Sequence, residues 1–190
     1  MPPDRPTAPG VSAYMVGLRP ALVVLALAAA PAPSVARPAP VGARLHRYLS
    51  QLDNDRAVRR EVLAWHRTMR NGCVAFASTA LRRVGVEVPQ RGLLDGEGVS
   101  RITRAFSQFL EEELGWRRVV RSRDLQVGDL VFTTDAPCCP GYPAHVFVFE
   151  GWRSRRRGVA LATDNQGRRR ARRLTGGGGV DGFAYALRGP

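Results

Sequence analysis

The hydrophobic pattern of this chain changes its period near residue 124, and that change restricts the possible folds more than any other feature. Before this point, apolar residues recur every three or four positions, as they do on one face of a helix. After it, apolar and polar residues alternate in short runs, as in strands with one buried face. Helices followed by an antiparallel run of strands predict an α+β fold.

Three helices are predicted in the first part. One begins at Asn54, with the apolar stripe of residues 58, 62, 65 and 69 on one face. A second begins at Cys73 and ends at Gly85; its small residues favour close packing on a sheet. A third begins at Ser100 and ends at Gly115.

Four strands are predicted after the change of period, at residues 130–133, 145–150, 158–164 and 182–187. Two arginine-rich segments, residues 153–157 and 168–173, are expected in the connections between them. Loops are expected at residues 93–98 and 176–179.

The N-terminal segment has the pattern of a secretory signal. An apolar run at residues 21–30 follows Arg19, and small residues follow it up to Ala36, the expected cleavage site. A membrane anchor is the alternative, but the run is about half the roughly 20 residues that a spanning helix needs. Met15 is an alternative start.

The predicted organisation is a signal peptide at residues 1–36, a linker at residues 37–53 and one domain at residues 54–190. The mature protein is then expected outside the cytoplasm, secreted or in the periplasm or cell envelope, with no transmembrane anchor after cleavage.

The chain carries a net charge of +13, and its basic residues are all arginine. A hydrophobic content of 44% is typical of a globular protein and argues against a disordered basic tail. The arginine clusters could bind a phosphate-rich polymer. No nucleic-acid-binding module is recognisable, and export argues against nucleic acid as a partner. The candidate residues for binding an anionic envelope polymer are Arg155, Arg156, Arg157, Arg168, Arg169 and Arg170; solvated hairpin tips are the alternative.

Four chemically suited residues lie at the ends of predicted elements. Cys73 begins a helix, His145 begins a strand, and Asp164 and Asn165 end the next strand. A helix N-terminus favours the thiolate form of a cysteine, and a neighbouring imidazole can accept the thiol proton. Asp164 is in phase with the alternation of its strand and Asn165 is one step out, so Asp164 is slightly favoured to orient the imidazole.

Other roles for these residues are possible. Cys73 could be a buried core residue, and His145 a strand-edge residue bonded to the backbone. Zinc binding by Cys73, Cys138, Cys139 and His145 is disfavoured, because the CxxC spacing of structural zinc sites is missing. We therefore expect no metal and no cofactor.

The order of these motifs resembles that of the NlpC-type and CHAP-type (cysteine- and histidine-dependent amidohydrolase/peptidase) cysteine peptidases. The resemblance rests on Cys73 at a helix start, the run Val127-Gly128-Asp129-Leu130-Val131-Phe132 and the run Ala144-His145-Val146-Phe147-Val148-Phe149, and spans residues 71–166. It implies a papain-like fold, with a central helix that carries the nucleophile packed on a small antiparallel sheet.

The resemblance also implies the roles of the residues. Cys73 would be the nucleophile, His145 the general base and then acid, and Asp164 or Asn165 the third group. The chain departs from the NlpC-type pattern in having no second histidine after His145. Asn71 is positioned as an oxyanion donor, although no diagnostic Tyr or Gln stands there.

The expected function is an exported cysteine hydrolase that cleaves amide bonds, in peptidoglycan stem peptides or cross-links, through a thioester acyl-enzyme. The alternative is a catalytically silent papain-like protein that binds the envelope. In that case, a disulfide from Cys138 or Cys139 to Cys73 could block the nucleophile.

Overall fold

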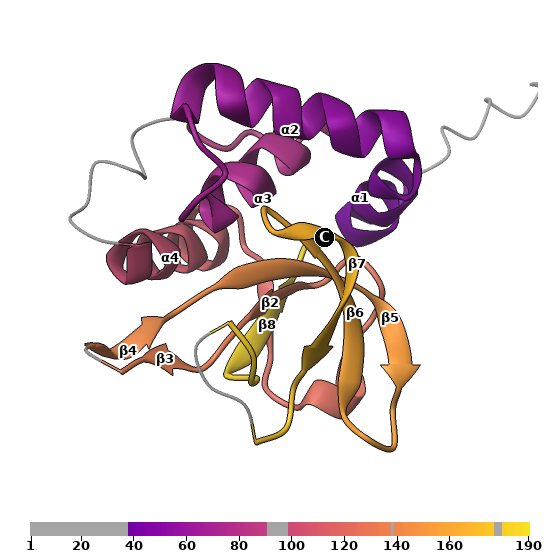
Figure 1. The fold of residues 1–190 in the computed structure, drawn as a ribbon, viewed down its shortest axis with the longest axis vertical. Coiled ribbons are helices and arrows are strands. Elements are labelled where there is room, and N and C mark those ends of the chain that lie inside the picture. The colour runs from indigo at the N-terminus through magenta and orange to yellow at the C-terminus, as the bar shows by residue number, and fades with distance from the viewer. Residues whose placement is uncertain (1–37, 91–98, 138, 177–179) are drawn as a thin grey trace, which may run out of the picture. The chain divides into compact units, whose positions relative to one another are not determined.

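The computed structural model describes residues 38–90, 99–137, 139–176 and 180–190. Within these ranges, four α-helices gather on one side of a six-stranded antiparallel sheet (Figure 1). The predicted α+β class is therefore confirmed. The helices come first in the chain: α1 (Val41–Ser50), α2 (Leu52–His66), α3 (Cys73–Arg83) and α4 (Val99–Gln108), which continues into a π-helical turn, η1 (Phe109–Glu113).

The sheet has the strand order β1-β8-β2-β5-β6-β7. Its central strands have sequences in which residues facing the two sides alternate. Strands β2, β5, β6 and β8 match the four predicted strands. The strands are β1 (Arg117–Val119), β2 (Leu130–Phe132), β5 (Val146–Ser154), β6 (Val159–Asp164), β7 (Gly167–Arg173) and β8 (Tyr185–Arg188). A separate two-stranded ladder contains β3 (Asp135–Ala136) and β4 (Cys139–Pro143), and a short 3-10 turn, η2, covers Ser122–Asp124.

Each face of the sheet is buried in its own hydrophobic cluster. On β5, Val146 and Val148 pack in the cluster that includes the helices. The intervening Phe147 and Phe149 pack on the opposite face with Ala160 and Ala162 of β6. The period of two that the sequence shows therefore separates two cores, one on each face.

The sequence predicted a linker at residues 37–53, but this segment includes the whole of α1. Val41, Leu45 and Leu49 of this helix are buried in the main cluster, at 5%, 0% and 0% exposure. Their spacing of four places them on one helix face. Helix α2 then begins at Leu52, two residues before the predicted Asn54.

The second arginine-rich segment is also placed differently from the prediction. Residues 168–173 belong to strand β7, which pairs with β6, and are not a connection between strands. In the first segment, the tip at residues 155–158 is a turn, whereas Arg153 and Ser154 still belong to β5. The helix predicted to continue to Met69 ends at His66, because Arg67 adopts a left-handed conformation with φ of 69°.

Several sequence predictions lie outside the described residues. These are the signal peptide at residues 1–36, the loop at 93–98, Cys138 and most of the glycine loop at 176–179. Within the described ranges, no helix combines the length and the apolar character needed to cross a bilayer.

We expect α1 to contribute to folding stability as a core element. Leu45→Ala should lower the free energy of unfolding by about 2–5 kcal/mol, because it opens a cavity in a fully buried site. Leu52→Ala, at a leucine that is 48% exposed, is the matched control and should cost under about 1 kcal/mol. Denaturant unfolding measures both. Equal effects of the two substitutions would contradict a core role for α1.

Candidate functional site

Cys73 is the first residue of α3, as predicted. The turn before it contains Asn71, with φ of 56°, and Gly72, which provides no side-chain cap for the helix. The first backbone N–H groups of α3 therefore have no acceptor within the helix, and they carry the positive end of its dipole. A negative charge on the Cys73 sulfur or on a substrate oxygen is stabilised at this position.

His145 immediately precedes β5 and is 3% exposed. Its carbonyl accepts a hydrogen bond of 3.0 Å from the backbone N–H of Thr133. This main-chain contact anchors the residue just before the strand, and the imidazole contacts the thiol of Cys73 on α3.

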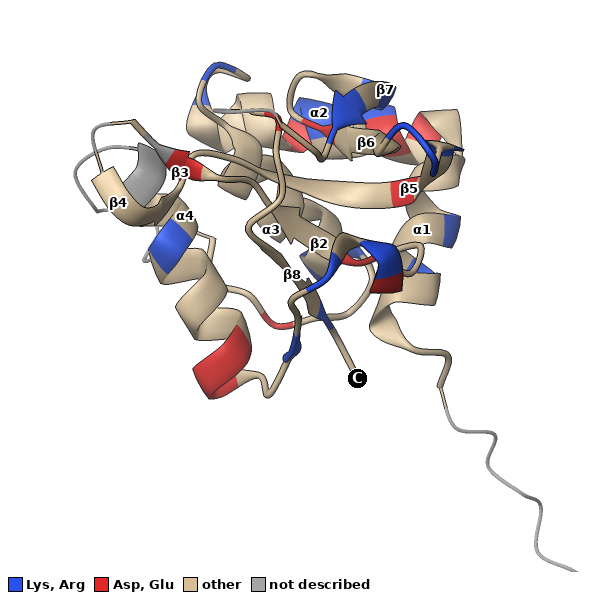
Figure 2. Cartoon of the chain, turned by 90° about the horizontal axis from the view of Figure 1, so that it is seen from below, with Lys and Arg blue, Asp and Glu red and all other residues tan. Residues whose placement is uncertain are grey.

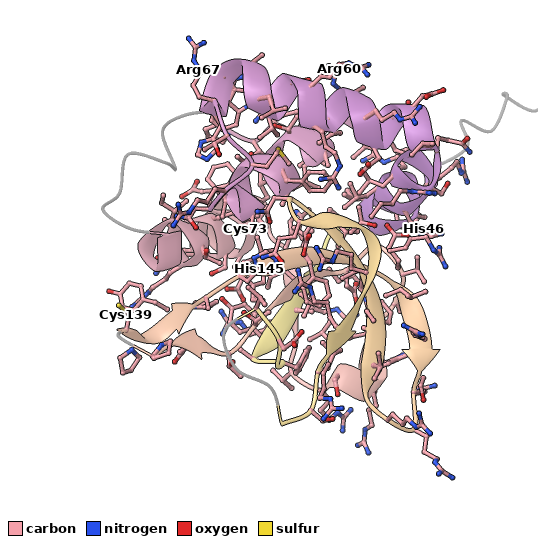
Figure 3. All side chains as sticks on the ribbon, in the orientation of Figure 1. His46, Arg60, Arg67, Cys73, Cys139 and His145 are labelled. Atoms are coloured by element: carbon pink, nitrogen blue, oxygen red, sulfur yellow. The ribbon has the colours of Figure 1, made fainter. Side chains whose placement is uncertain are left out.

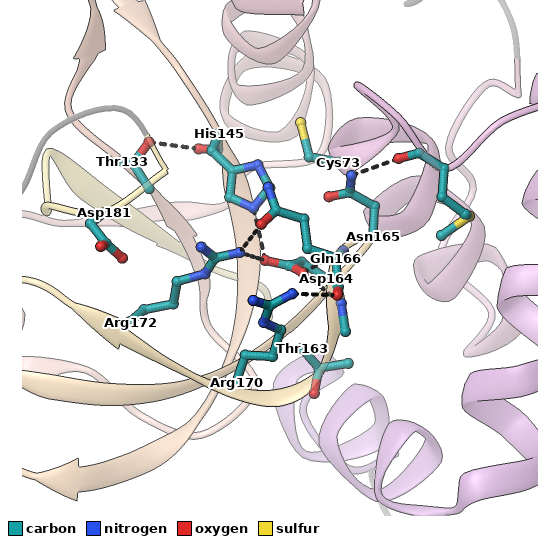
Figure 4. Close-up of polar contacts among 12 residues, drawn as sticks. Cys73, Thr133, His145, Thr163, Asp164, Asn165, Gln166, Arg170, Arg172 and Asp181 are labelled. Atoms are coloured by element: carbon teal, nitrogen blue, oxygen red, sulfur yellow. Dashed lines mark hydrogen bonds and ion pairs between the residues drawn. The ribbon is translucent and has the colours of Figure 1, made fainter.

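Asp164 is the partner of the imidazole. Its Oδ2 lies 2.8 Å from Nε2 of His145 (Figure 4), so Nδ1 is the nitrogen left for Cys73. The other carboxylate oxygen, Oδ1, accepts hydrogen bonds from the backbone N–H groups of Gln166 (2.7 Å) and Gly167 (3.2 Å). The phase argument that favoured Asp164 over Asn165 agrees with this placement.

Asn165 points elsewhere. Its Nδ2 donates a 2.7 Å hydrogen bond to the carbonyl of Met69, in the turn between α2 and α3, and its Oδ1 is buried without a partner among the described residues. Arg59 of α2 donates to the carbonyl oxygens of both Asp164 (2.8 Å) and Asn165 (3.2 Å). Asn165 therefore links the end of β6 to the helices.

Arg172 is a residue of this site that the sequence did not reveal. Its Nη2 donates to Oδ2 of Asp164 at 2.6 Å and to Oε1 of Gln166 at 3.0 Å, and the side chain is 5% exposed. It lies opposite Ala160 in the pairing of β6 with β7. No signal in the sequence marks it, because within β7 the apolar Ala171 is exposed and Arg172, one arginine among several, is buried.

The ionisation of the site favours a thiolate and an imidazolium. Burial would raise the pKa of the Cys73 thiol, but the hydrogen bond and charge of His145, the Val146 backbone N–H and the Thr103 hydroxyl together lower it below its usual value. Burial would lower the pKa of His145, but Asp164 and Cys73 together raise it to about 9. The pair is therefore charged between the lowered pKa of Cys73 and about pH 9.

The carboxylate stays ionised over the same range. Burial would raise the pKa of Asp164, but His145 and Arg172 together lower it below its usual value. An ionised Asp164 and a protonated His145 then form a buried ion pair. The guanidinium of Arg172 forms a second ion pair with the same carboxylate.

The remaining candidate residues are placed apart from this group. Asn71 is exposed in its turn, and its role as an oxyanion donor stays a prediction. Cys73 is a free thiol, and Figure 3 shows Cys139 in the outlying ladder of β3 and β4, well separated from it. Among the described side chains, no three His, Cys, Asp or Glu residues are grouped so that they could hold a metal ion.

The six arginines proposed for polymer binding differ in exposure. Arg155, Arg156 and Arg157 are exposed at the turn between β5 and β6, and Arg169 and Arg170 are exposed on β7. Arg168 is partly buried and donates to the carbonyls of Leu49 and Ser50 at the end of α1. Figure 2 shows arginine on both α2 and β7, so positive charge is not confined to the turn. Arg155 and Arg170 also donate to main-chain carbonyls, of Arg123 and Gln166, but their side chains remain exposed.

The chain was compared with models of known protein families, with curated proteins and with solved structures, and none of these matches it.

The charged state of the Cys73–His145 pair can be tested by alkylation at varied pH. With His145 present, the alkylation rate of Cys73 by iodoacetamide should stay high at a pH where an ordinary thiol is protonated. His145→Gln removes both the hydrogen bond and the charge of His145, which are the first two causes that lower the pKa of Cys73. Each pKa unit changes the thiolate fraction about tenfold, so the alkylation rate near pH 7 should fall about tenfold or more.

The matched control is His46→Gln, which removes a histidine paired with Glu150 rather than with the thiol. Peptide mass spectrometry identifies the alkylated residue. An alkylation profile for Cys73 that is identical in the wild type and in His145→Gln would rule out the ion pair.

Proposed function

We propose that the protein is an exported cysteine hydrolase of the NlpC/CHAP type, with a papain-like fold, that cleaves amide bonds in peptidoglycan stem peptides or cross-links. One observation carries the proposal. A thiol at the N-terminus of a helix contacts an imidazole, and the second nitrogen of that imidazole is held 2.8 Å from a buried carboxylate. This order of groups is what nucleophilic catalysis by cysteine needs.

The arrangement of the elements supports the same proposal. Helix α3, which carries Cys73, packs against β5, which follows His145, and against β6, which ends in Asp164. The papain-like fold has the same relation between a nucleophile-bearing helix and a small antiparallel sheet. Cleavage of the signal at Ala36 and location in the envelope belong to the proposal as well.

In the proposed reaction, the Cys73 thiolate attacks the amide carbonyl and a carbon–sulfur bond forms. The oxygen that becomes negative is placed toward the free N–H groups at the start of α3. The imidazolium of His145 gives its proton to the nitrogen as the carbon–nitrogen bond breaks, and the amine leaves. Water then gives a proton to His145, attacks the thioester and releases the acid and Cys73.

Asp164 stays ionised and exchanges no proton in this scheme. It holds Nε2 of His145 protonated, so that Nδ1 is the nitrogen that exchanges a proton with sulfur and substrate. No cofactor takes part.

A second candidate is a noncatalytic protein that binds an anionic envelope polymer. The observation that favours it is burial: Cys73 is 2% exposed and His145 is 3% exposed. A substrate carbonyl reaches the sulfur only by a narrow approach or after local movement. Both functions share the envelope as partner and differ in whether a bond is cleaved.

Cys73→Ala should abolish the release of fragments from purified peptidoglycan, because no other group supplies the nucleophile. The protein should still fold, since the change removes a single sulfur and costs about 1 kcal/mol. Mass spectrometry of the soluble fraction measures release, and Cys139→Ala, which alters a cysteine of the β3–β4 ladder, is the control that should retain it.

Fragment release that persists in Cys73→Ala would end the cysteine-hydrolase proposal. A wild-type protein that binds the polymer and releases nothing would favour the noncatalytic candidate.

Binding to the anionic polymer should depend on the turn between β5 and β6. Replacing Arg155, Arg156 and Arg157 together by Gln should weaken sedimentation with cell walls, and the loss should shrink as salt rises, because exposed charges are screened. Replacing Arg56, Arg60 and Arg67 on and next to α2 removes the same charge from another exposed surface. If both triple variants bind equally, net charge and not this turn determines attachment.

A further inference from the structure

The carboxylate of Asp164 is shared between two cations. Oδ2 lies 2.8 Å from Nε2 of His145 and 2.6 Å from Nη2 of Arg172. Oδ1 is occupied by the backbone N–H groups of Gln166 and Gly167. The carboxylate therefore stabilises the protonated imidazole less than it would if Arg172 were absent.

The position of Asp164 does not depend on Arg172 alone. The two backbone N–H groups fix Oδ1, and Arg59 binds the carbonyl of the same residue. The carboxylate can thus keep its orientation when Arg172 is replaced. What only Arg172 supplies is a buried positive charge at the oxygen that faces His145.

We propose that Arg172 is a positioning residue that limits the basicity of His145, by sharing Oδ2 of Asp164 with it, and so sets the pH range in which the Cys73–His145 pair is charged. The inference rests on the proposed function for its role in catalysis, but the contact itself can be tested in a protein without hydrolytic activity.

Among the described residues, few charged groups face His145. Cys73 faces it from α3 and Asp164 from β6, whereas Arg172 of β7 reaches the oxygen of Asp164 that faces the ring. From α2, Arg59 is paired with the carboxylate of Asp55 and reaches only main-chain oxygens near the site. Asp181, from the segment before β8, accepts a hydrogen bond from the backbone N–H of Arg173.

A neighbouring like charge lowers the pKa of an imidazole, and a neighbouring opposite charge raises it. Removing Arg172 leaves the charge of Asp164 to His145 alone, so the pKa of His145 should rise. If Arg172 had only a structural role, its removal would have the opposite effect. Asp164 would become less ordered and lose its contact with the ring, and the pKa of His145 would fall.

The experiment follows the ring resonances of His145 by NMR as pH is varied in the full chain. They are assigned by comparison with His145→Gln. In Arg172→Gln the titration midpoint should rise from about 9 by about one pKa unit. This is the smallest shift expected from a charge within about 4–6 Å. Arg172→Met, which removes the charge and keeps an apolar stem in the buried site, should do the same.

Three further variants test whether the effect depends on the charge of residue 172, on its position and on the carboxylate of Asp164. Arg172→Lys keeps a cation and should leave the midpoint near that of the wild type. Arg173→Gln removes an exposed neighbouring charge and should not move it. In an Asp164→Asn background, Arg172→Gln should no longer raise the midpoint, because the shared oxygen has lost its charge.

The proposal is overturned if the midpoint of His145 is unchanged or lower in folded Arg172→Gln and Arg172→Met, or if Arg173→Gln raises it equally. Melting curves establish that the variants are folded. If fragments are released from peptidoglycan, the alkaline limb of the rate profile should move with the NMR midpoint. A midpoint that moves in a protein that releases nothing supports the role of Arg172 and counts against hydrolysis.

Discussion

The buried carboxylate of Asp164 is the contact on which the rest of the site depends. A charge in a site that is 0% exposed is costly unless it is paired and fully hydrogen-bonded. Asp164 meets that condition with two backbone N–H groups from its own turn, an imidazole from the start of β5 and a guanidinium from β7. Three strands are thereby joined at one point, and a change in the register of any of them would remove a contact of the buried charge.

The helices are attached to the same point by a second set of contacts. Asp55 holds the guanidinium of Arg59, which donates to the carbonyls that end β6. Asn165 donates to the carbonyl of Met69, four residues before Cys73. The turn that leads into α3 is thus fixed to the strand that carries Asp164.

The sequence was sufficient wherever burial imposes a period. It predicted α3, the four apolar strands and the phase that separates Asp164 from Asn165. It failed at α1, whose stripe of Val41, Leu45 and Leu49 is present in the sequence but belongs to a short helix that was assigned to a linker. It also failed at β7, where a run of arginines conceals the strand. Arg172 was missed because its burial follows from pairing with β6, a nonlocal contact that charge composition does not reveal.

The surroundings of Cys73 differ from those of a core cysteine. A core cysteine is a small neutral residue that needs only apolar neighbours. Here the thiol lies beside an imidazole whose pKa is raised to about 9, backed by an ionised carboxylate and an arginine. Apolar residues of similar volume would often stabilise such a site as well or better. The stability of the fold therefore does not explain why four ionisable groups lie together in it. A reaction that needs a thiolate and a proton donor would explain it, and this supports the proposal that Cys73 is the nucleophile.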